Sequence, residues 1–374
     1  MNFEEIAEEF SQIPVSIKQF LDSMGGTIET MESTFEEGEI QQVDAMVASY
    51  YEVEGDMEGF DREVDKLLQL LRGEYDPDSV EEIEEIERVS RTLIQSIEQF
   101  QTHCRELADV FSSRGMVSQA TAFEDVANAL TGLPTAIKDS LFNNYLLHIL
   151  KAEHFPGSLR SEVDDLVESL ASATGEQRQN ILGILVFLAE EEPELVAPHS
   201  ETLAANLSNA SPNIQHNLSS IFILLAKTHP EQTAHVKEQA LELVDASQPQ
   251  IAISATQLLV EHSLTLDEAE RIADRIRLLL DQSTNSEFGS SIRINMTYVL
   301  SQLAESHPAA VDDEYYLSEV AALLNDSTPG VVENSIAFLG SLDRSEFADE
   351  IARARANSDD EGVMAEADAV LSGF

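Results

Sequence analysis

Prolines recur at a fixed interval through the later part of this sequence. Pro156, Pro193 and Pro230 lie 37 residues apart, and Pro308 follows 78 residues later, close to two such intervals. Each proline comes directly after an apolar run typical of a helix, as in IFILLAKTHP and VLSQLAESHP. Because proline cannot continue a helix but fits the first turn of the next one, each of these positions predicts a helix boundary. A chain with such a period is built from similar units placed side by side.

A second set of prolines has the same period. The segments NASPNI (209–214), DASQPQI (245–251) and NDSTPGV (325–331) place Pro212 and Pro249 37 residues apart, with Pro329 80 residues further on. Two breaks in each period leave two amphipathic helices per unit, which is typical of a helical solenoid. We therefore predict an all-α fold in which residues 115–374 form an α-α superhelical solenoid of about six or seven helix pairs.

The period and the turn residues of 115–374 resemble those of the HEAT-like repeat family, with armadillo repeats as close relatives. The Asp and Arg that often hold fixed places in HEAT repeats do not recur here in register. The segment DQSTNSEFGSS (281–291) also lengthens one repeat. The resemblance implies an extended concave face that binds a protein or peptide partner.

Six residues at corresponding places in the predicted second helices form a row that we call the asparagine ladder. They are Asn143, Asn180, Asn217, Ser254, Asn295 and Asn334. Asparagine is a mediocre helix former, so its recurrence needs a reason. In one interpretation each side chain is buried and bonds the neighbouring repeat, because a buried polar group must be satisfied. In the other, which the resemblance to armadillo repeats implies, the amides line the concave face and clamp the backbone of an extended peptide.

Two of the prolines follow a histidine. His229 and His307 lie beside the last carbonyl groups of a predicted helix, where an imidazole can donate to those carbonyls and complement the helix dipole. We interpret both as structural residues and not as metal ligands. The sequence has no pair of histidines at the spacing that would place two ligands on one helix face. The single cysteine, Cys104, is interpreted as a small buried hydrophobe.

Residues 1–114 predict a different structure, based on heptads. In 79–113 and in 40–71, apolar side chains recur at spacings that keep a seam against a partner helix. The seam of 79–113 consists of Ile83, Ile86, Ser90, Leu93, Ile97, Phe100, Cys104, Leu107 and Phe111. The seam of 40–71 consists of Ile40, Val43, Val47, Tyr50, Met57, Val64, Leu68 and Leu71. The short connector RGEYDPDS between them implies an antiparallel, coiled-coil-like helical hairpin.

Further details of this region are predicted. Gly73 suits the C-terminus of the first helix, and Ser79 with Glu82 matches a capping box at the start of the second. A third helix is expected to pack against the pair through Ile17, Phe20, Met24, Ile28, Met31 and Phe35. We therefore divide the chain into a helical hairpin or bundle at 1–114 and a solenoid at 115–374. A homodimer through 1–114 is a further prediction.

The charge balance constrains the working environment and the partners. The chain holds 70 acidic and 21 basic residues, a formal net charge of −49, spread along the whole sequence. Such a protein repels itself in dilute buffer, whereas in molar salt the screening length falls to about 3 Å. The composition resembles that of cytoplasmic proteins of salt-accumulating halophiles, which implies a high-salt cytoplasm. It argues against a nucleic-acid partner, since no basic stripe is present, and the apolar run ILGILVFLA (181–189) is too short for membrane insertion.

The sequence offers little support for catalysis. It contains no glycine-rich phosphate loop, no G-x-S-x-G or H-E-x-x-H motif and no paired-cysteine metal site, so we predict a non-enzyme without cofactor or metal. The favoured function is a protein–protein scaffold or adaptor. One alternative is a regulatory signalling module whose hairpin docks on a receptor or transducer coiled coil. Another is a lyase-like enzyme, because the repeats resemble those that accompany lyase activities in some bacteria.

Overall fold

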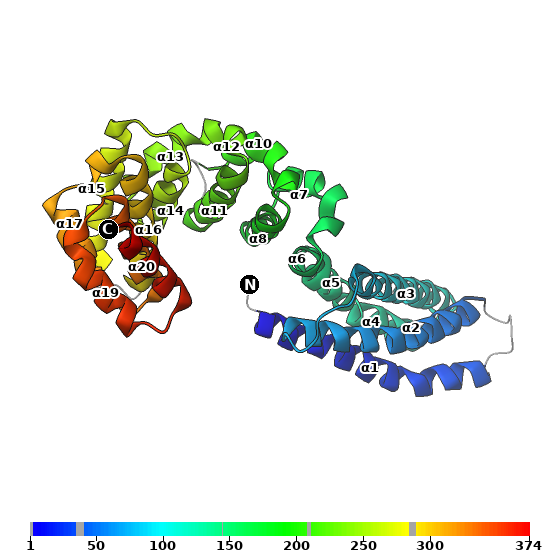
Figure 1. The fold of residues 1–374 in the computed structure, drawn as a ribbon. Coiled ribbons are helices and arrows are strands. Elements are labelled where there is room, and N and C mark those ends of the chain that lie inside the picture. The colour runs from blue at the N-terminus through cyan, green and yellow to red at the C-terminus, as the bar shows by residue number, and fades with distance from the viewer. Residues whose placement is uncertain (1–2, 35–40, 144, 208–210, 284–288) are drawn as a thin grey trace. The chain divides into compact units, whose positions relative to one another are not determined.

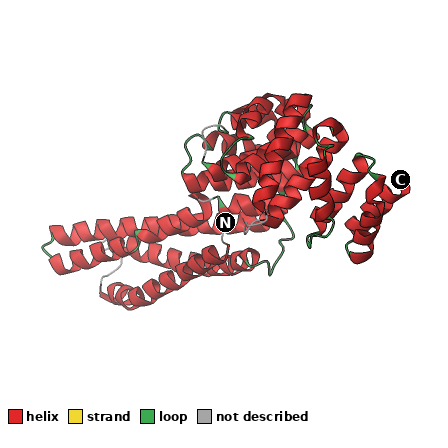
Figure 2. Ribbon diagram, turned by 90° about the vertical axis from the view of Figure 1, so that its left-hand side faces the viewer, coloured by secondary structure: helices red, strands yellow, loops and turns green. Residues whose placement is uncertain are grey.

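The computed structural model describes residues 3–34, 41–143, 145–207, 211–283 and 289–374. In these ranges every regular element is a helix (Figure 2). The chain divides into two compact units, Met1–Phe187 and Leu188–Phe374, and the division falls inside one helix, α8 (Gly175–Glu191). The all-α class predicted from the sequence is confirmed.

The first unit begins with four helices that form a bundle. They are α1 (Phe3–Thr34), α2 (Gln41–Leu71), α3 (Val80–Ser113) and α4 (Val117–Ala129). α2 packs along α3, α1 packs on α2, and α4 packs on α3 (Figure 1). The two heptad segments are therefore partners within one chain.

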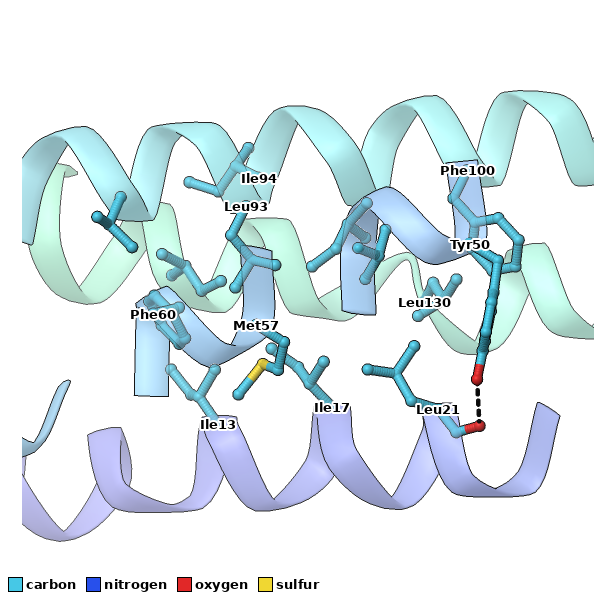
Figure 3. Packing of buried hydrophobic residues seen from close by; sticks show 14 of the residues in the cluster. Ile13, Ile17, Leu21, Tyr50, Met57, Phe60, Leu93, Ile94, Phe100 and Leu130 are labelled. Atoms are coloured by element: carbon cyan, nitrogen blue, oxygen red, sulfur yellow. Dashed lines mark hydrogen bonds between the residues drawn. The ribbon is translucent and has the colours of Figure 1, made fainter. Parts of the chain in front are cut away.

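Apolar side chains fill the interior of this bundle. Every predicted seam residue within the described ranges is buried. α1 supplies the predicted third helix, with Ile17 and Ile28 fully buried in its inner face. In Figure 3, side chains of α1 point toward Met57 and Phe60 of α2, and the Tyr50 hydroxyl donates a hydrogen bond to the carbonyl of Leu21 at 3.1 Å. The predicted positions Phe35 and Ile40 lie outside the described residues.

The connector between α2 and α3 confirms one predicted detail and corrects another. Gly73 has a φ of 66°, and its N–H donates to the carbonyl of Leu70 at 3.0 Å, which closes the end of α2 as predicted. Ser79 is the N-cap of α3, but its side chain makes no cap hydrogen bond, so the predicted capping box is wrong. The Glu82 carboxylate instead accepts hydrogen bonds from the Tyr75 hydroxyl and from the backbone N–H of Asp78. Glu82 therefore bonds residues of the connector and not the N-cap residue, Ser79.

The rest of the first unit leads into the repeats. It comprises α5 (Gly132–Lys138), the π-helical turn η1 (Asp139–Asn143), α6 (Leu146–His154), the 3-10 turn η2 (Pro156–Ser161), α7 (Val163–Ser169) and the first part of α8. Because α4 packs on α3, the bundle continues past residue 114. The division of the chain after residue 114 stays a prediction.

The second unit repeats one pattern of a first and a second helix. The first helices are α9 (Pro193–Val196) with α10 (Ser200–Ala204), α12 (Pro230–Thr233) with α13 (Lys237–Leu243), α15 (Leu266–Ser283), α17 (Glu314–Leu323) and α19 (Ala348–Asn357). The second helices are α11 (Pro212–Thr228), α14 (Pro249–Val260), α16 (Gly289–Ser306), α18 (Pro329–Ser341) and α20 (Glu361–Gly373). With α7 and α8, the described residues form six helix pairs, which fits the predicted solenoid.

Within the second unit, helices of the same kind lie side by side. α11 packs on α14, α14 on α16, α16 on α18 and α18 on α20, while the first helices lie along the other side of this row (Figure 1). The periodic prolines stand at the first position of the elements that they begin, as predicted. α18 and α20 approach closely at Gly340, where a Cβ atom would lie only 2.5 Å from Val370 Cγ2.

Candidate protein-interaction surface

Two layers of the second unit differ in what they present to solvent. We call α11, α14, α16 and α18 the second-helix layer, and α10, α13, α15 and α17 the first-helix layer. Four members of the asparagine ladder, Asn217, Ser254, Asn295 and Asn334, lie one on each helix of the second-helix layer. The period of 37 to 41 residues therefore places them in a row, as the sequence predicts for a solenoid.

Two ladder members in the middle of this row are hydrogen-bonded across repeats. The Ser254 side chain on α14 is 2% exposed, and its Oγ lies 3.1 Å from Nδ1 of His216 on α11. On α16, the Oδ1 of Asn295 accepts a hydrogen bond from Gln257 Nε2 of α14 at 3.0 Å. Each bond joins residues 38 positions apart in the sequence. These side chains therefore tie one repeat to the next.

Asn334 on α18 continues the same connection. Its Nδ2 donates to the backbone carbonyl of Ile294 at 3.2 Å and to Thr297 Oγ1 at 3.4 Å, both on α16. The other polar atom of each of these two amides has no hydrogen-bond partner among the described residues. Nothing there accepts from Asn295 Nδ2, and nothing there donates to Asn334 Oδ1. Asn217 is half-buried on α11. Asn295 and Asn334 thus leave one amide donor and one amide acceptor for other contacts.

The other two ladder members belong to the first unit. Asn143 is exposed in η1, ahead of α6, and its Nδ2 donates to Asp139 Oδ1 at 2.7 Å. Its backbone carbonyl accepts from Gln177 Nε2 of α8 at 3.0 Å. Asn180 is half-buried on α8. The inter-repeat contact at Asn143 is thus made by its backbone, and the role of the ladder as a whole stays a prediction.

The second-helix layer contains very little charge. α15 and α16 form one pair and have 18 residues each. The charged residues of α15 are Asp267, Glu268, Glu270, Arg271, Asp274, Arg275, Arg277 and Asp281, whereas those of α16 are Arg293 and Glu305. Across the whole layer the charged residues are Lys227, Arg293, Glu305 and Glu333, so its formal net charge is zero. In a chain of net charge −49 this layer is a neutral surface.

Both positive charges of the layer have partners. Arg293 Nε lies 2.7 Å from Asp326 Oδ2. Burial alone would raise the pKa of Asp326, but the hydrogen bonds from Arg293 and Thr328 outweigh it and hold that pKa below its usual value. Lys227 Nζ lies 5.7 Å from the ring centroid of Tyr298 on α16, within cation–π range. Arg293 is therefore paired with a carboxylate, whereas the exposed Lys227 has an aromatic ring beside it.

Tyr298 is the aromatic side chain of the layer that contacts three repeats. Its hydroxyl donates to Glu261 Oε1, at the end of α14, at 2.7 Å, while Lys227 of α11 faces its ring. Burial, together with the hydrogen bond to Glu261, raises the pKa of Tyr298 far above its usual value, so the hydroxyl stays neutral. A half-buried, neutral tyrosine is the kind of residue that anchors protein interfaces.

Sequence reasoning found the ladder but missed the neutrality of its surroundings. Charge was counted along the chain, where it is evenly spread, and not helix by helix. The signal was available, because the segments 212–226 and 249–260 contain no charged residue at all. Counting charge separately for the two helices of each predicted pair would have revealed it.

The histidines before proline are structural, but not in the predicted way. The backbone N–H of His229 donates to the carbonyl of Leu225 at 2.6 Å, and that of His307 donates to Leu303 at 2.7 Å. The His307 Nε2 instead donates to the carbonyl of Leu264, at the end of the preceding repeat, at 2.9 Å. The predicted imidazole cap is therefore wrong, because both residues have left the helical conformation (φ −134° and −140°) and their own N–H groups close the last turn.

Cys104 is fully buried in the bundle, and burial raises the pKa of its thiol to about 12. The interpretation of this residue as a small buried hydrophobe is confirmed. Over the described ranges, no group of three or more histidine, cysteine or acidic side chains is placed to hold a metal ion. None of the described helices combines the length and apolarity needed to cross a bilayer.

Comparison with known proteins gives structural similarity only. No protein-family model matches the sequence, and no curated protein matches it. Among solved structures, the designed armadillo repeat protein YIII(Dq)4CqI is 15% identical with a TM-score of 0.43, covering 56% of this chain and 98% of its own. An engineered protein of the Northeast Structural Genomics Consortium is 15% identical with a TM-score of 0.44, covering 95% of this chain and 87% of its own. Kap121p is 12% identical with a TM-score of 0.34, covering 95% of this chain and 41% of its own.

At these identities and TM-scores, the solenoid assignment rests on the helix pairing itself. Each described pair packs its second helix on the second helix of the next pair in the second unit. That arrangement is what defines an α-solenoid.

Proposed function

We propose that this chain is a non-catalytic scaffold that binds a protein or peptide partner through the second-helix layer. The observation that supports it most is the neutral surface of half-buried side chains. One row is formed by Ser220, Gln257, Tyr298 and Ala337, beside the row formed by Asn217, Ser254, Asn295 and Asn334. Centres of protein interfaces are depleted in charge, as this layer is, and Tyr298 adds a half-buried aromatic side chain to it.

In this proposal the asparagine ladder has two roles that do not compete. At Asn295 and Asn334 one half of the amide bonds the preceding repeat, through Asn295 Oδ1 and Asn334 Nδ2. The other half is offered to the partner, which meets a donor at Asn295 Nδ2 and an acceptor at Asn334 Oδ1. A peptide backbone supplies the complementary carbonyl and N–H groups.

The alternatives lack such support. A regulatory module would dock the hairpin on a receptor or transducer coiled coil, and a homodimer through 1–114 would use the same helices. Both heptad seams are already buried within α1–α4, so either contact requires another face of the bundle. A lyase-like activity has no group of residues in its favour. All three stay predictions from the sequence.

Charge inserted into the layer is expected to abolish partner binding. The double variant Ser220→Glu, Gln302→Glu places carboxylates on two half-buried positions of α11 and α16. An unpaired carboxylate buried in an interface should weaken affinity by at least about tenfold. The full chain is used to capture partners from a lysate at native salt, and the affinity of the most enriched protein is then measured for each variant.

The matched control inserts the same charge into the first-helix layer. Ser318→Glu, Ala322→Glu changes two exposed positions of α17 and should leave the affinity unchanged. Equal affinity of the unsubstituted chain and both double variants for the partner would mean that the partner does not use the second-helix layer. Equal loss in both double variants would contradict the proposal as well, since it would indicate a general effect of added charge.

We also propose that the chain works in a high-salt cytoplasm, on the strength of its net charge of −49. Helical content measured by circular dichroism across a KCl series is expected to be full in molar salt and to fall below about 1 M, where screening weakens. A matched series in glycerol, which does not screen charge, should give no such protection. Full helicity in dilute buffer would contradict this proposal and leave the scaffold function untouched.

A further inference from the structure

The chain's net charge of −49 suggests a basic partner, but the acidic residues are not on the surface that we propose for binding. In the second unit most of them lie outside the second-helix layer, on the first helices, in the connections and on α20, as the compositions of α15 and α20 illustrate. The second-helix layer has only two carboxylates of its own, Glu305 and Glu333. A lysine- or arginine-rich segment would thus find more carboxylates almost anywhere else on this chain.

We infer that the segment of the partner that occupies the second-helix layer is uncharged, made of polar and apolar residues; this inference rests on the proposed function. Charge complementarity leads to it directly. The two cations of the layer are engaged, Arg293 with Asp326 and Lys227 with the Tyr298 ring. A cationic segment would lose hydration on the layer and find only Glu305 and Glu333 as carboxylates of these four helices, and an anionic one would face the field of the whole chain.

The groups that remain on the layer suit a neutral occupant. Asn295 Nδ2 and Asn334 Oδ1 match the carbonyl and N–H groups of a backbone. Tyr298, Ile294 and Ala337 are half-buried and offer apolar contact between them. In molar salt, where charges are screened within about 3 Å, recognition through such contacts keeps its strength.

The test is the composition of peptides that this surface selects. A displayed library of random dodecapeptides is panned on the full chain, at the lowest KCl concentration at which the chain keeps its helical signal. That condition favours basic peptides most, because screening is weakest there. Bound peptides count as dependent on the second-helix layer when Ser220→Glu, Gln302→Glu changes their affinity at least about tenfold, in either direction, and Ser318→Glu, Ala322→Glu does not.

Uncharged sequences among the peptides that depend on the second-helix layer are the expected result. Circular dichroism and thermal unfolding of each variant establish that it is folded. Layer-dependent peptides rich in lysine and arginine would overturn the inference and leave the scaffold function standing. If no recovered peptide distinguishes the two double variants, the proposed function fails and the inference fails with it.

Discussion

Phe100→Ala is expected to destabilise the first unit by about 4 kcal/mol, the largest effect that we predict. Phe100 is fully buried on α3. Its ring makes edge contacts with Phe20 of α1 at 6.3 Å and with Tyr50 of α2 at 6.0 Å between centroids. Three helices meet at this ring, so truncation removes apolar contacts on every side and leaves a cavity that the surrounding rigid helices cannot close.

Two further variants give this prediction its controls. Phe100→Leu keeps most of the volume and is expected to cost about 1.5 kcal/mol. Gln99→Ala changes the neighbouring exposed side chain and should stay within about 0.5 kcal/mol. Urea unfolding of the full chain in molar KCl gives the free energies, and hydrogen exchange locates the loss of protection in α1–α4. Similar stabilities for Phe100→Ala and Gln99→Ala would mean that the bundle core is not where the structure places it.

The position of Phe100 illustrates what the sequence could predict. A heptad seam states which side chains face a partner helix, so burial of Ile97, Phe100 and Cys104 follows from spacing alone. The solenoid was equally accessible, because proline can occupy only a few places in a helix and therefore marks helix starts. Periodicity and proline are both local signals that tertiary contacts rarely override.

The polar details were less predictable because several partners compete for each group. Glu82 has the spacing of a capping box, yet the Tyr75 hydroxyl and the Asp78 N–H take its carboxylate. His307 lies beside the end of its own helix, yet its Nε2 reaches the carbonyl of Leu264 in the preceding repeat. In both cases the hydrogen-bond partner depends on the tertiary arrangement of segments around the group. Residue spacing within one helix does not specify that arrangement.

The candidate site could be predicted from the sequence only in part. Spacing predicted that the ladder residues would form a row, and Ser254, Asn295 and Asn334 do so across neighbouring repeats. Which half of each amide bonds the neighbouring repeat depends on rotamers and could not be derived. The neutrality of the layer was present in the sequence, but it becomes meaningful only when one knows that α11, α14, α16 and α18 share a surface.

The second large effect is expected at an ion cluster around the buried Lys151 in the first unit. Lys151 of α6 is 6% exposed, and its Nζ lies 3.5 Å from Glu162 Oε1 and 3.8 Å from Glu87 Oε2 of α3. Glu162 also lies 2.8 Å from His148 Nε2. The cluster therefore joins the bundle helix α3 to α6 and to the turn before α7.

Lys151→Met is expected to destabilise the first unit by about 2 kcal/mol, because Glu162 loses this cation while Glu87 keeps an ion pair with Arg91 at 2.9 Å. Methionine keeps much of the side-chain length, so packing changes little and the loss reports mainly on charge. The double variant Lys151→Met, Glu162→Gln removes the carboxylate that has lost this cation and should regain part of the loss. Unfolding free energies of the single and double variants, measured in urea at constant salt, check both statements.

The same cluster predicts a pH dependence of stability through His148. Burial lowers the pKa of His148 below its ordinary value. Glu162 opposes this effect, and the nearby Lys151 cation adds to it. A histidine with a lowered pKa contributes stability that is present above its unfolded-state pKa of about 6.5 and is lost as the pH falls through the folded-state value. Lys151→Met removes a neighbouring cation and raises the pKa of His148. Its deficit relative to the unsubstituted chain should therefore shrink as the pH falls below about 6.5. A deficit that stays constant with pH would mean that Lys151 does not influence the titration of His148.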